Sequence, residues 1–161
     1  HTNVGVTGVS MGGSMAAATA ATIETPLKAA ICIGPVGPAS AFTEGALSGQ
    51  VDWPALAEDY ELPWNPRAEK AQHAAEQQAV KDALNKTMGV VDLRGYAAPP
   101  RPDWAILVGA RHDGYVPAHS VTALHDHWTG SELRWIEASH VTAVMLHSGS
   151  FFQAIVDAAN R

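Results

Sequence analysis

The chain has 161 residues, of which 47% are hydrophobic and 16% are charged, and its formal net charge is −6. This length suffices for one domain with a hydrophobic core, and the composition is unlike that of a disordered chain. The negative charge, with no cluster of Lys or Arg, argues against nucleic acid as a partner, and the sequence shows no signal peptide and no transmembrane segment, so a cytoplasmic location is the default expectation.

A strand is predicted over residues 3–9, which are rich in β-branched side chains and closed by Gly8, and a helix of Ala, Met and Gly is predicted over residues 11–22. Ser10 lies at the switch from strand to helix, between Gly8 and Gly12. A Gly-x-Ser-x-Gly sequence at such a switch is typical of the nucleophile elbow, a strained turn that holds the serine Oγ clear of the strand.

The turn at Ser10 is expected to require both glycines, because side chains at Gly8 and Gly12 would collide with neighbouring backbone. The backbone N–H of Met11 lies at the N-terminus of the predicted helix and is expected to stabilise an oxyanion. The same pattern also fits a tight turn at a contact between helix and sheet, with no chemistry at the serine.

The next apolar run, residues 28–33, predicts a second short strand that ends at Gly-Pro pairs. It contains the one cysteine, Cys32, so an internal disulfide and a cysteine-based zinc site are excluded, and a buried, inert thiol is favoured. A long insertion, about 36–98, separates this strand from the next and includes a polar helix at about 67–86. Because that helix has only a thin apolar stripe, we expect it on the surface, covering a neighbour with one narrow face.

Two more strands are predicted over residues 104–108 and 133–137, and two more helices over residues 118–128 and 148–159. Short strands that alternate with helices indicate an α/β domain with a parallel sheet. The carboxyl ends of such strands meet at one edge of the sheet, so the loops that follow them are the places to look for chemistry.

A serine nucleophile needs a histidine as its base and an acid that orients the histidine, and in elbow hydrolases the chain order is serine, acid, histidine. Asp113 is the candidate acid, because it lies in the loop that leaves the third strand, although its role could be only to shape that turn. His140 is the candidate base, because it lies in a loop directly after the fourth strand. His147 is the fallback base, and Asp92 and Asp103 are weaker acids, since neither directly follows a strand.

Metal and cofactor sites have little support in the sequence. His125 and His127 flank Asp126, but adjacent residues on a helix point in different directions and no partner motif follows, so a solvated helix face is expected there. Gly12-Gly13 lacks the lysine of a phosphate-binding loop. We therefore expect neither a metal nor a cofactor.

The elbow, the Asp113 loop and the His140 loop together resemble the C-terminal half of a protein of the α/β-hydrolase superfamily. More narrowly, VGVTGVSMGGSMAA, ASAFTEGALS at residues 39–48 and the ending SHVTAVMLHSGSFFQAIVDA are similar to the family of α/β-hydrolase domain-containing protein eighteen. This resemblance runs from the elbow to the C-terminus. The sequence departs from the family at Ser14, where a larger residue is usual, and at Ser139, where glycine is usual.

The resemblance implies that residues 1–161 form the C-terminal part of one α/β-hydrolase domain, with about the last four of the usual eight strands, the N-terminal strands missing, and the insertion as a helical cap. It implies a serine hydrolase of carboxylic esters, of small molecules or of lipids, in which Ser10, Asp113 and His140 form the triad and an acyl-enzyme is the intermediate. Half a sheet alone could leave this chain inactive. A catalytically silent hydrolase fold that binds a partner and an acyltransferase with the same triad are the alternatives.

Overall fold

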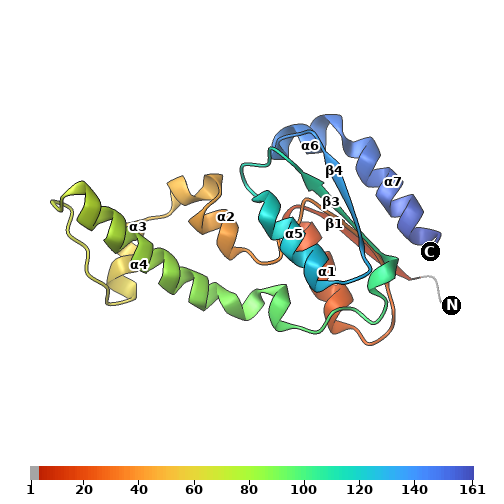
Figure 1. Ribbon diagram of the computed structural model, residues 1–161, viewed down its shortest axis with the longest axis horizontal. Helices are drawn as coiled ribbons and strands as arrows, with labels where there is room; N and C mark the ends of the chain where they lie inside the picture. The colour runs from red at the N-terminus through yellow and green to blue at the C-terminus, as the bar shows by residue number, and fades with distance from the viewer. Residues whose placement is uncertain (1–3) are drawn as a thin grey trace.

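A computed structural model describes residues 4–161 and shows a sheet of four parallel strands (Figure 1). The strands are β1 (Gly5–Val9), β2 (Lys28–Cys32), β3 (Ala105–Ala110) and β4 (Glu132–Ile136), and they lie side by side in sequence order. The prediction of an α/β fold with about four parallel strands is therefore confirmed. Asn3, which the sequence placed in the first strand, and His1 lie outside the described residues.

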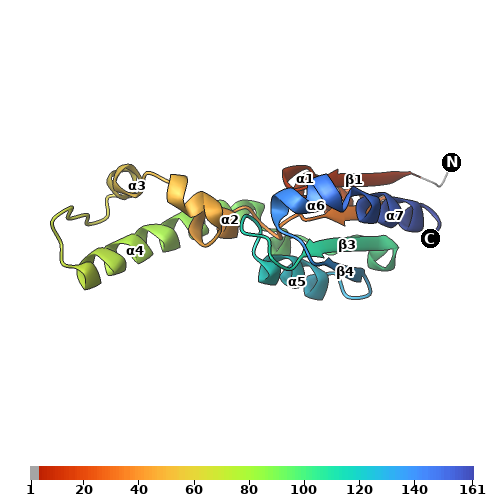
Figure 2. The ribbon, with the colours of Figure 1, turned by 90° about the horizontal axis from the view of Figure 1, so that it is seen from above.

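Helices cover both faces of the sheet (Figures 1 and 2). One layer holds α1 (Met11–Thr22) and α5 (Ala118–His127), and the other holds α6 (His140–Leu146) and α7 (Ser148–Ala159). Three of these four helices were predicted to within two residues, but α6 was not, because the sequence interpretation placed His140 in a loop. The reason for that error lies in how α6 begins, which is described with the site below.

The two central strands, β2 and β3, are buried along their whole length. Alternate residues of β2 face opposite layers: Ile31 packs with α1 and α5, whereas Cys32 packs with α7. Burial raises the pKa of the Cys32 thiol to about 12, so the thiol stays protonated. Helix α1 approaches the sheet closely because its inner face carries small residues, and a Cβ at Gly13 would lie 2.9 Å from the Cys32 carbonyl oxygen.

The strands end in register at one edge of the sheet. Val9 is paired with Cys32, Cys32 with Val108, and Ala110 with Ile136. The loops that follow β1, β3 and β4 therefore leave the sheet on the same side, which is the arrangement that a site built from several loops needs.

The insertion between β2 and β3 extends away from the carboxyl edge of the sheet as a helical arm (Figures 1 and 2). Its helical segments are α2 (Ala39–Thr43), η1 (Ala46–Gln50), α3 (Trp53–Asp59), α4 (Lys70–Met88), η2 (Gly89–Val91) and η3 (Leu93–Gly95), and the short η4 (Pro102–Trp104) precedes β3. The arm has a small core of its own, in which Val80 of α4 packs against Trp53 and Ala57 of α3. The thin apolar stripe of the polar helix thus covers α3.

The β1 side of the sheet is open. Among residues 4–161, strand β1 pairs with β2 alone, and its residues alternate between exposed and half-buried. Phe152 and Val156 of α7 and Met145 and Leu146 of α6 are exposed as well. Within residues 4–161, no helix combines the length and the apolar character that crossing a bilayer requires.

Candidate active site

The turn that carries Ser10 is a strained strand-to-helix junction. Ser10 has φ 56° and ψ −122°, a backbone region that non-glycine residues rarely occupy. Its N–H still donates to the Cys32 carbonyl at 2.9 Å, so the residue remains tied to β2 while the chain reverses into α1. The strain is held in place by the sheet on one side and by the first turn of α1 on the other.

Glycine is required at different positions around Ser10 for different reasons. A Cβ at Gly8 would collide with the carbonyl of Gly12, as the sequence predicted. The prediction for Gly12 is wrong, because a Cβ there would meet nothing within 4 Å. The second crowded position is Gly13, which lies against the Cys32 carbonyl and the backbone of Gly34. Close packing of α1 on the end of β2, not the turn itself, therefore requires the later glycine.

The imidazole of His140 reaches Ser10 from the other end of the chain. Its Nε2 lies 2.9 Å from the Ser10 Oγ. His140 is the first residue of α6, and Ser139 caps that helix by accepting from the Thr142 N–H while the Thr142 hydroxyl accepts from the Ser139 N–H. The sequence placed His140 in a loop because this reciprocal cap uses threonine at the position where glutamate or glutamine is the usual signal. The helix start fixes the backbone from which the imidazole projects.

The carboxylate of Asp113 lies behind the imidazole. Its Oδ2 is 2.7 Å from the His140 Nδ1, and its Oδ1 accepts from the N–H groups of Tyr115 and Val116 at 2.8 and 2.9 Å. The Asp113 side chain is 2% exposed and that of His140 16%. A buried carboxylate needs such partners. With Asp113 accepting from Nδ1–H, the Nε2 of a neutral imidazole is left to accept the proton of Ser10.

Met11 follows Ser10 as the first residue of α1. The first amides of a helix have no carbonyl partner within the helix, and the helix dipole makes them attractive to negative charge. The Met11 side chain is largely exposed, so the backbone is the part of this residue that concerns the site. Its N–H is one of the donors at the N-terminus of α1, next to Ser10.

The other candidate residues lie elsewhere. Asp92 pairs with Arg94, whose guanidinium lowers the Asp92 pKa, and Asp103 pairs with Arg101. His147 lies at the junction of α6 and α7. The remaining described histidines have partners away from Ser10: His73 packs on Trp64, His112 pairs with Glu137, His119 with Glu44, His125 with Ser131, and His127 with the Tyr96 carbonyl.

Within residues 4–161, no group of three or more His, Cys, Asp or Glu side chains is placed to hold an ion. His125 and His127, which flank Asp126, make their contacts with different segments of the chain.

Tyr115 is a residue of this site that sequence reasoning missed. Its ring centroid lies 5.1 Å from that of His140, and its N–H is one of the two donors to Asp113. The neighbouring Gly114 accepts at 2.5 Å from the N–H of Ala46, which belongs to the base of the arm. The bond to Asp113 is local, but the contacts with His140 and Ala46 join segments that are far apart in the sequence, and no local pattern reveals them.

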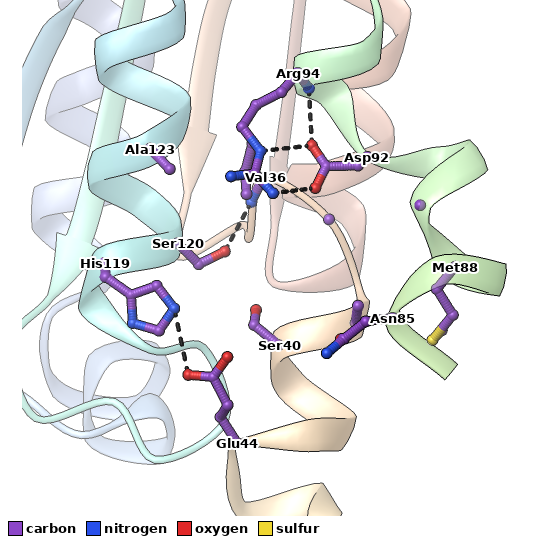
Figure 3. Close-up of a pocket in the computed structure, with 13 residues that line it drawn as sticks. Val36, Ser40, Glu44, Asn85, Met88, Asp92, Arg94, His119, Ser120 and Ala123 are labelled. Atoms are coloured by element: carbon purple, nitrogen blue, oxygen red, sulfur yellow. Dashed lines mark hydrogen bonds and ion pairs between the residues drawn. The ribbon is translucent and has the colours of Figure 1, made fainter. Parts of the chain in front are cut away.

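Two pockets lie beside the arm, and none of the three side chains Ser10, Asp113 and His140 lines either of them. The pocket in Figure 3, about 370 Å³, lies between the arm and α5; Glu44 and His119 pair across it, and the buried Ser40 hydroxyl has no partner among the described residues. A second, apolar groove of about 330 Å³ runs between α1 and the end of the arm. It includes Ser14 and Met15, one helical turn beyond Ser10.

Several solved structures share this fold. An enol-lactonase from Burkholderia xenovorans LB400 matches with a TM-score of 0.54 at 19% identity, over 98% of this chain and 65% of that chain. An esterase of Pyrococcus furiosus matches with a TM-score of 0.54 at 15% identity, over 99% and 54%. An acylaminoacyl peptidase of Pyrococcus horikoshii matches with a TM-score of 0.59 at 11% identity, over 97% and 23%.

The chain therefore spans no more than about two thirds of the length of these structures, and at such identities they show the fold alone. The match to a sequence family is more specific. The family described as alpha/beta hydrolase domain containing 18 matches residues 1–161, and the chain belongs to this family of hydrolase-fold proteins.

Proposed function

We propose that the chain carries the catalytic residues of a serine hydrolase of carboxylic esters, with Ser10 as nucleophile, His140 as base and Asp113 as the acid that orients it. One observation supports this most: Ser10 Oγ, His140 and Asp113 are joined by two hydrogen bonds of 2.9 and 2.7 Å. These distances match those that a nucleophile, its base and the orienting group require.

The proposed reaction has two halves. Ser10 Oγ attacks the ester carbonyl while His140 Nε2 takes its proton, and the Met11 N–H donates to the oxyanion. The carbon–oxygen bond to the alcohol then breaks, His140 returns the proton to the leaving oxygen, and an acyl-enzyme remains. In the second half, water attacks the acyl carbon with His140 again as base, which releases the carboxylic acid and restores Ser10. Asp113 keeps its contact with Nδ1 throughout and stabilises the imidazolium.

The arm at residues 36–98 is proposed to act as a cap that helps to form the acyl site. The apolar groove supports this, because α1 contributes Met15 and Ala18 to one wall and the returning end of the arm contributes Leu93 and Tyr96 to the other. A groove of this character suits the hydrocarbon chain of a lipid ester. We therefore propose lipid acyl esters as the substrate class.

We also propose that the working domain has further strands beside β1. The evidence is the unpaired edge of β1, the exposed apolar side chains of α6 and α7, and the greater length of solved structures that share the fold. A second oxyanion donor would then come from outside the described site.

The test of this function is covalent labelling of Ser10 by a fluorophosphonate probe in the full-length protein. Ser10→Ala should abolish labelling and His140→Ala should lower its rate at least about 100-fold, because both remove reacting groups. His147→Ala is the matched control and should label as the wild type does. Absence of labelling in the wild type, or a rate that His140→Ala leaves unchanged, would refute the proposal.

A further inference from the structure

Tyr115 contacts the base and the acid of the proposed triad at once. Its ring lies 5.1 Å from the imidazole of His140, centroid to centroid, with the planes tilted by 44°. Its N–H donates to Asp113 Oδ1 at 2.8 Å. We propose that Tyr115 is a positioning residue of this site, a role that rests on the proposed function: its ring confines the imidazole to the orientation that joins Ser10 to Asp113.

The ring of Tyr115 restricts rotation of the His140 side chain, which the hydrogen bonds alone do not prevent. A histidine side chain turns about two bonds, and the bond to the Ser10 hydroxyl is lost whenever the serine turns toward substrate. The tyrosine ring limits rotation of the imidazole during that interval. Tyr115 is itself partly exposed, whereas the His140 side chain beside it is mostly buried.

The contact gains strength as the reaction proceeds. When His140 takes the proton of Ser10, the imidazole becomes a cation, and a cation within about 6 Å of an aromatic centroid is attracted by the ring. The contact with Tyr115 is thus stronger in the transition state than in the free enzyme. Interactions of this kind act on kcat more than on KM.

The position of Tyr115 is set in turn by the base of the arm. Its carbonyl oxygen lies 2.6 Å from the place that a Cβ on Gly45 would occupy, and Ala46 donates to the adjacent Gly114 carbonyl at 2.5 Å. The arm therefore contacts the backbone of the loop that carries Asp113 (residues 111–117, the acid loop). A shift of the arm would therefore move Tyr115 and, with it, the imidazole of His140.

The test compares three substitutions at Tyr115 in the full-length protein, with the rate of fluorophosphonate labelling and with kcat and KM on a p-nitrophenyl ester. Tyr115→Phe keeps the ring and should stay within about twofold of the wild type. Tyr115→Ala and Tyr115→Leu keep the backbone donor but remove the ring, and each should lower the labelling rate and kcat about tenfold, with KM within about twofold.

Leucine fills the space without an aromatic face, so Tyr115→Leu decides the matter if the alanine variant does not fold. The control is Trp104→Leu, which removes a half-buried aromatic ring just before β3, at the opposite end of that strand from Asp113, and should label within about twofold of the wild type. Equal rates for the leucine and phenylalanine variants of Tyr115, or an equal loss in Trp104→Leu, would overturn the role of the ring. Failure of the proposed function is seen separately, as unchanged labelling in Ser10→Ala.

Discussion

Two residues at the carboxyl edge of the sheet have left-handed backbone conformations without being glycine. Ser10 has φ 56° after β1, and Ile33 has φ 44° after β2. Such conformations cost about 1–3 kcal/mol each and persist where the surroundings hold them. Ile33 is fully buried, and its N–H donates to the Val108 carbonyl at 2.6 Å. The sheet thus holds both strained residues next to the loops that form the site.

At the same scale, the carboxylate of Asp113 should govern the orientation of His140. Asp113→Asn can still accept from Tyr115 and Val116, so the fold should survive, but an amide NH₂ in place of Oδ2 cannot accept from the His140 Nδ1–H. The imidazole would then present its proton to Ser10 instead of a free Nε2. Labelling of Ser10 should fall about 1,000-fold or more, while the midpoint of thermal unfolding changes little. A variant that labels at more than one tenth of the wild-type rate would contradict this account.

Among the elements, those with a simple periodicity could be predicted and those fixed by distant contacts could not. The strands and α1, α5 and α7 follow from short apolar runs and from alternation with helices. Ser10, Asp113 and His140 could be singled out because each comes directly after, or soon after, a strand of a parallel sheet. Helix α6 was missed because its cap pairs Ser139 with Thr142, and Gly13 was missed because its neighbours belong to β2 and the loop after it.

Two glycines of the arm can test its contact with the acid loop: Gly45 caps η1, and Gly49 lies within η1. A methyl group at Gly45 would meet the carbonyl oxygens of Tyr115 and Ala41 at 2.6 and 2.8 Å, whereas one at Gly49 would meet nothing within 4 Å. Gly45→Ala should therefore displace the acid loop, lower the stability by about 1–3 kcal/mol and slow the labelling of Ser10 about tenfold.

Gly49→Ala is the matched control for that change and should leave both the unfolding midpoint and the labelling rate close to those of the wild type. If Gly45→Ala lowers stability without slowing the labelling, the arm supports the fold but does not position the acid loop.

For the molecule as a whole, the order of strands and the place of the arm explain why the site lies at one edge and why the other side is open. All four strands run parallel and in sequence order, so their loops collect at the carboxyl edge, where the arm also begins (Figure 2). The unpaired β1 and the exposed side chains of α6 and α7 form the open side. The extent of this open side could not be predicted from the sequence, because hydrophobic periodicity indicates which face of an element is apolar but not which segment covers it.

An unpaired strand edge beside apolar side chains promotes association. We expect the chain of 161 residues on its own to self-associate, and a lysine at Val4, an exposed position just before β1, to reduce the association. Size-exclusion chromatography with light scattering measures the mass directly. The control is Val90→Lys, which changes another exposed valine, one that belongs to the arm, and should leave the mass unchanged. A wild-type chain that elutes as a monomer would contradict the expectation.

The arm also divides the site between two pieces of the chain. Ser10 precedes residues 36–98, while Asp113 and His140 follow them, and β2 and β3 pair across the division along most of their length. A cut in the distal part of the arm would leave Ser10 on one polypeptide and Asp113 and His140 on another, joined only by the ladder of the sheet and the packing of its helices. Under the proposed function, labelling of Ser10 in a mixture of two separately produced halves would therefore report how much of the domain has reassembled.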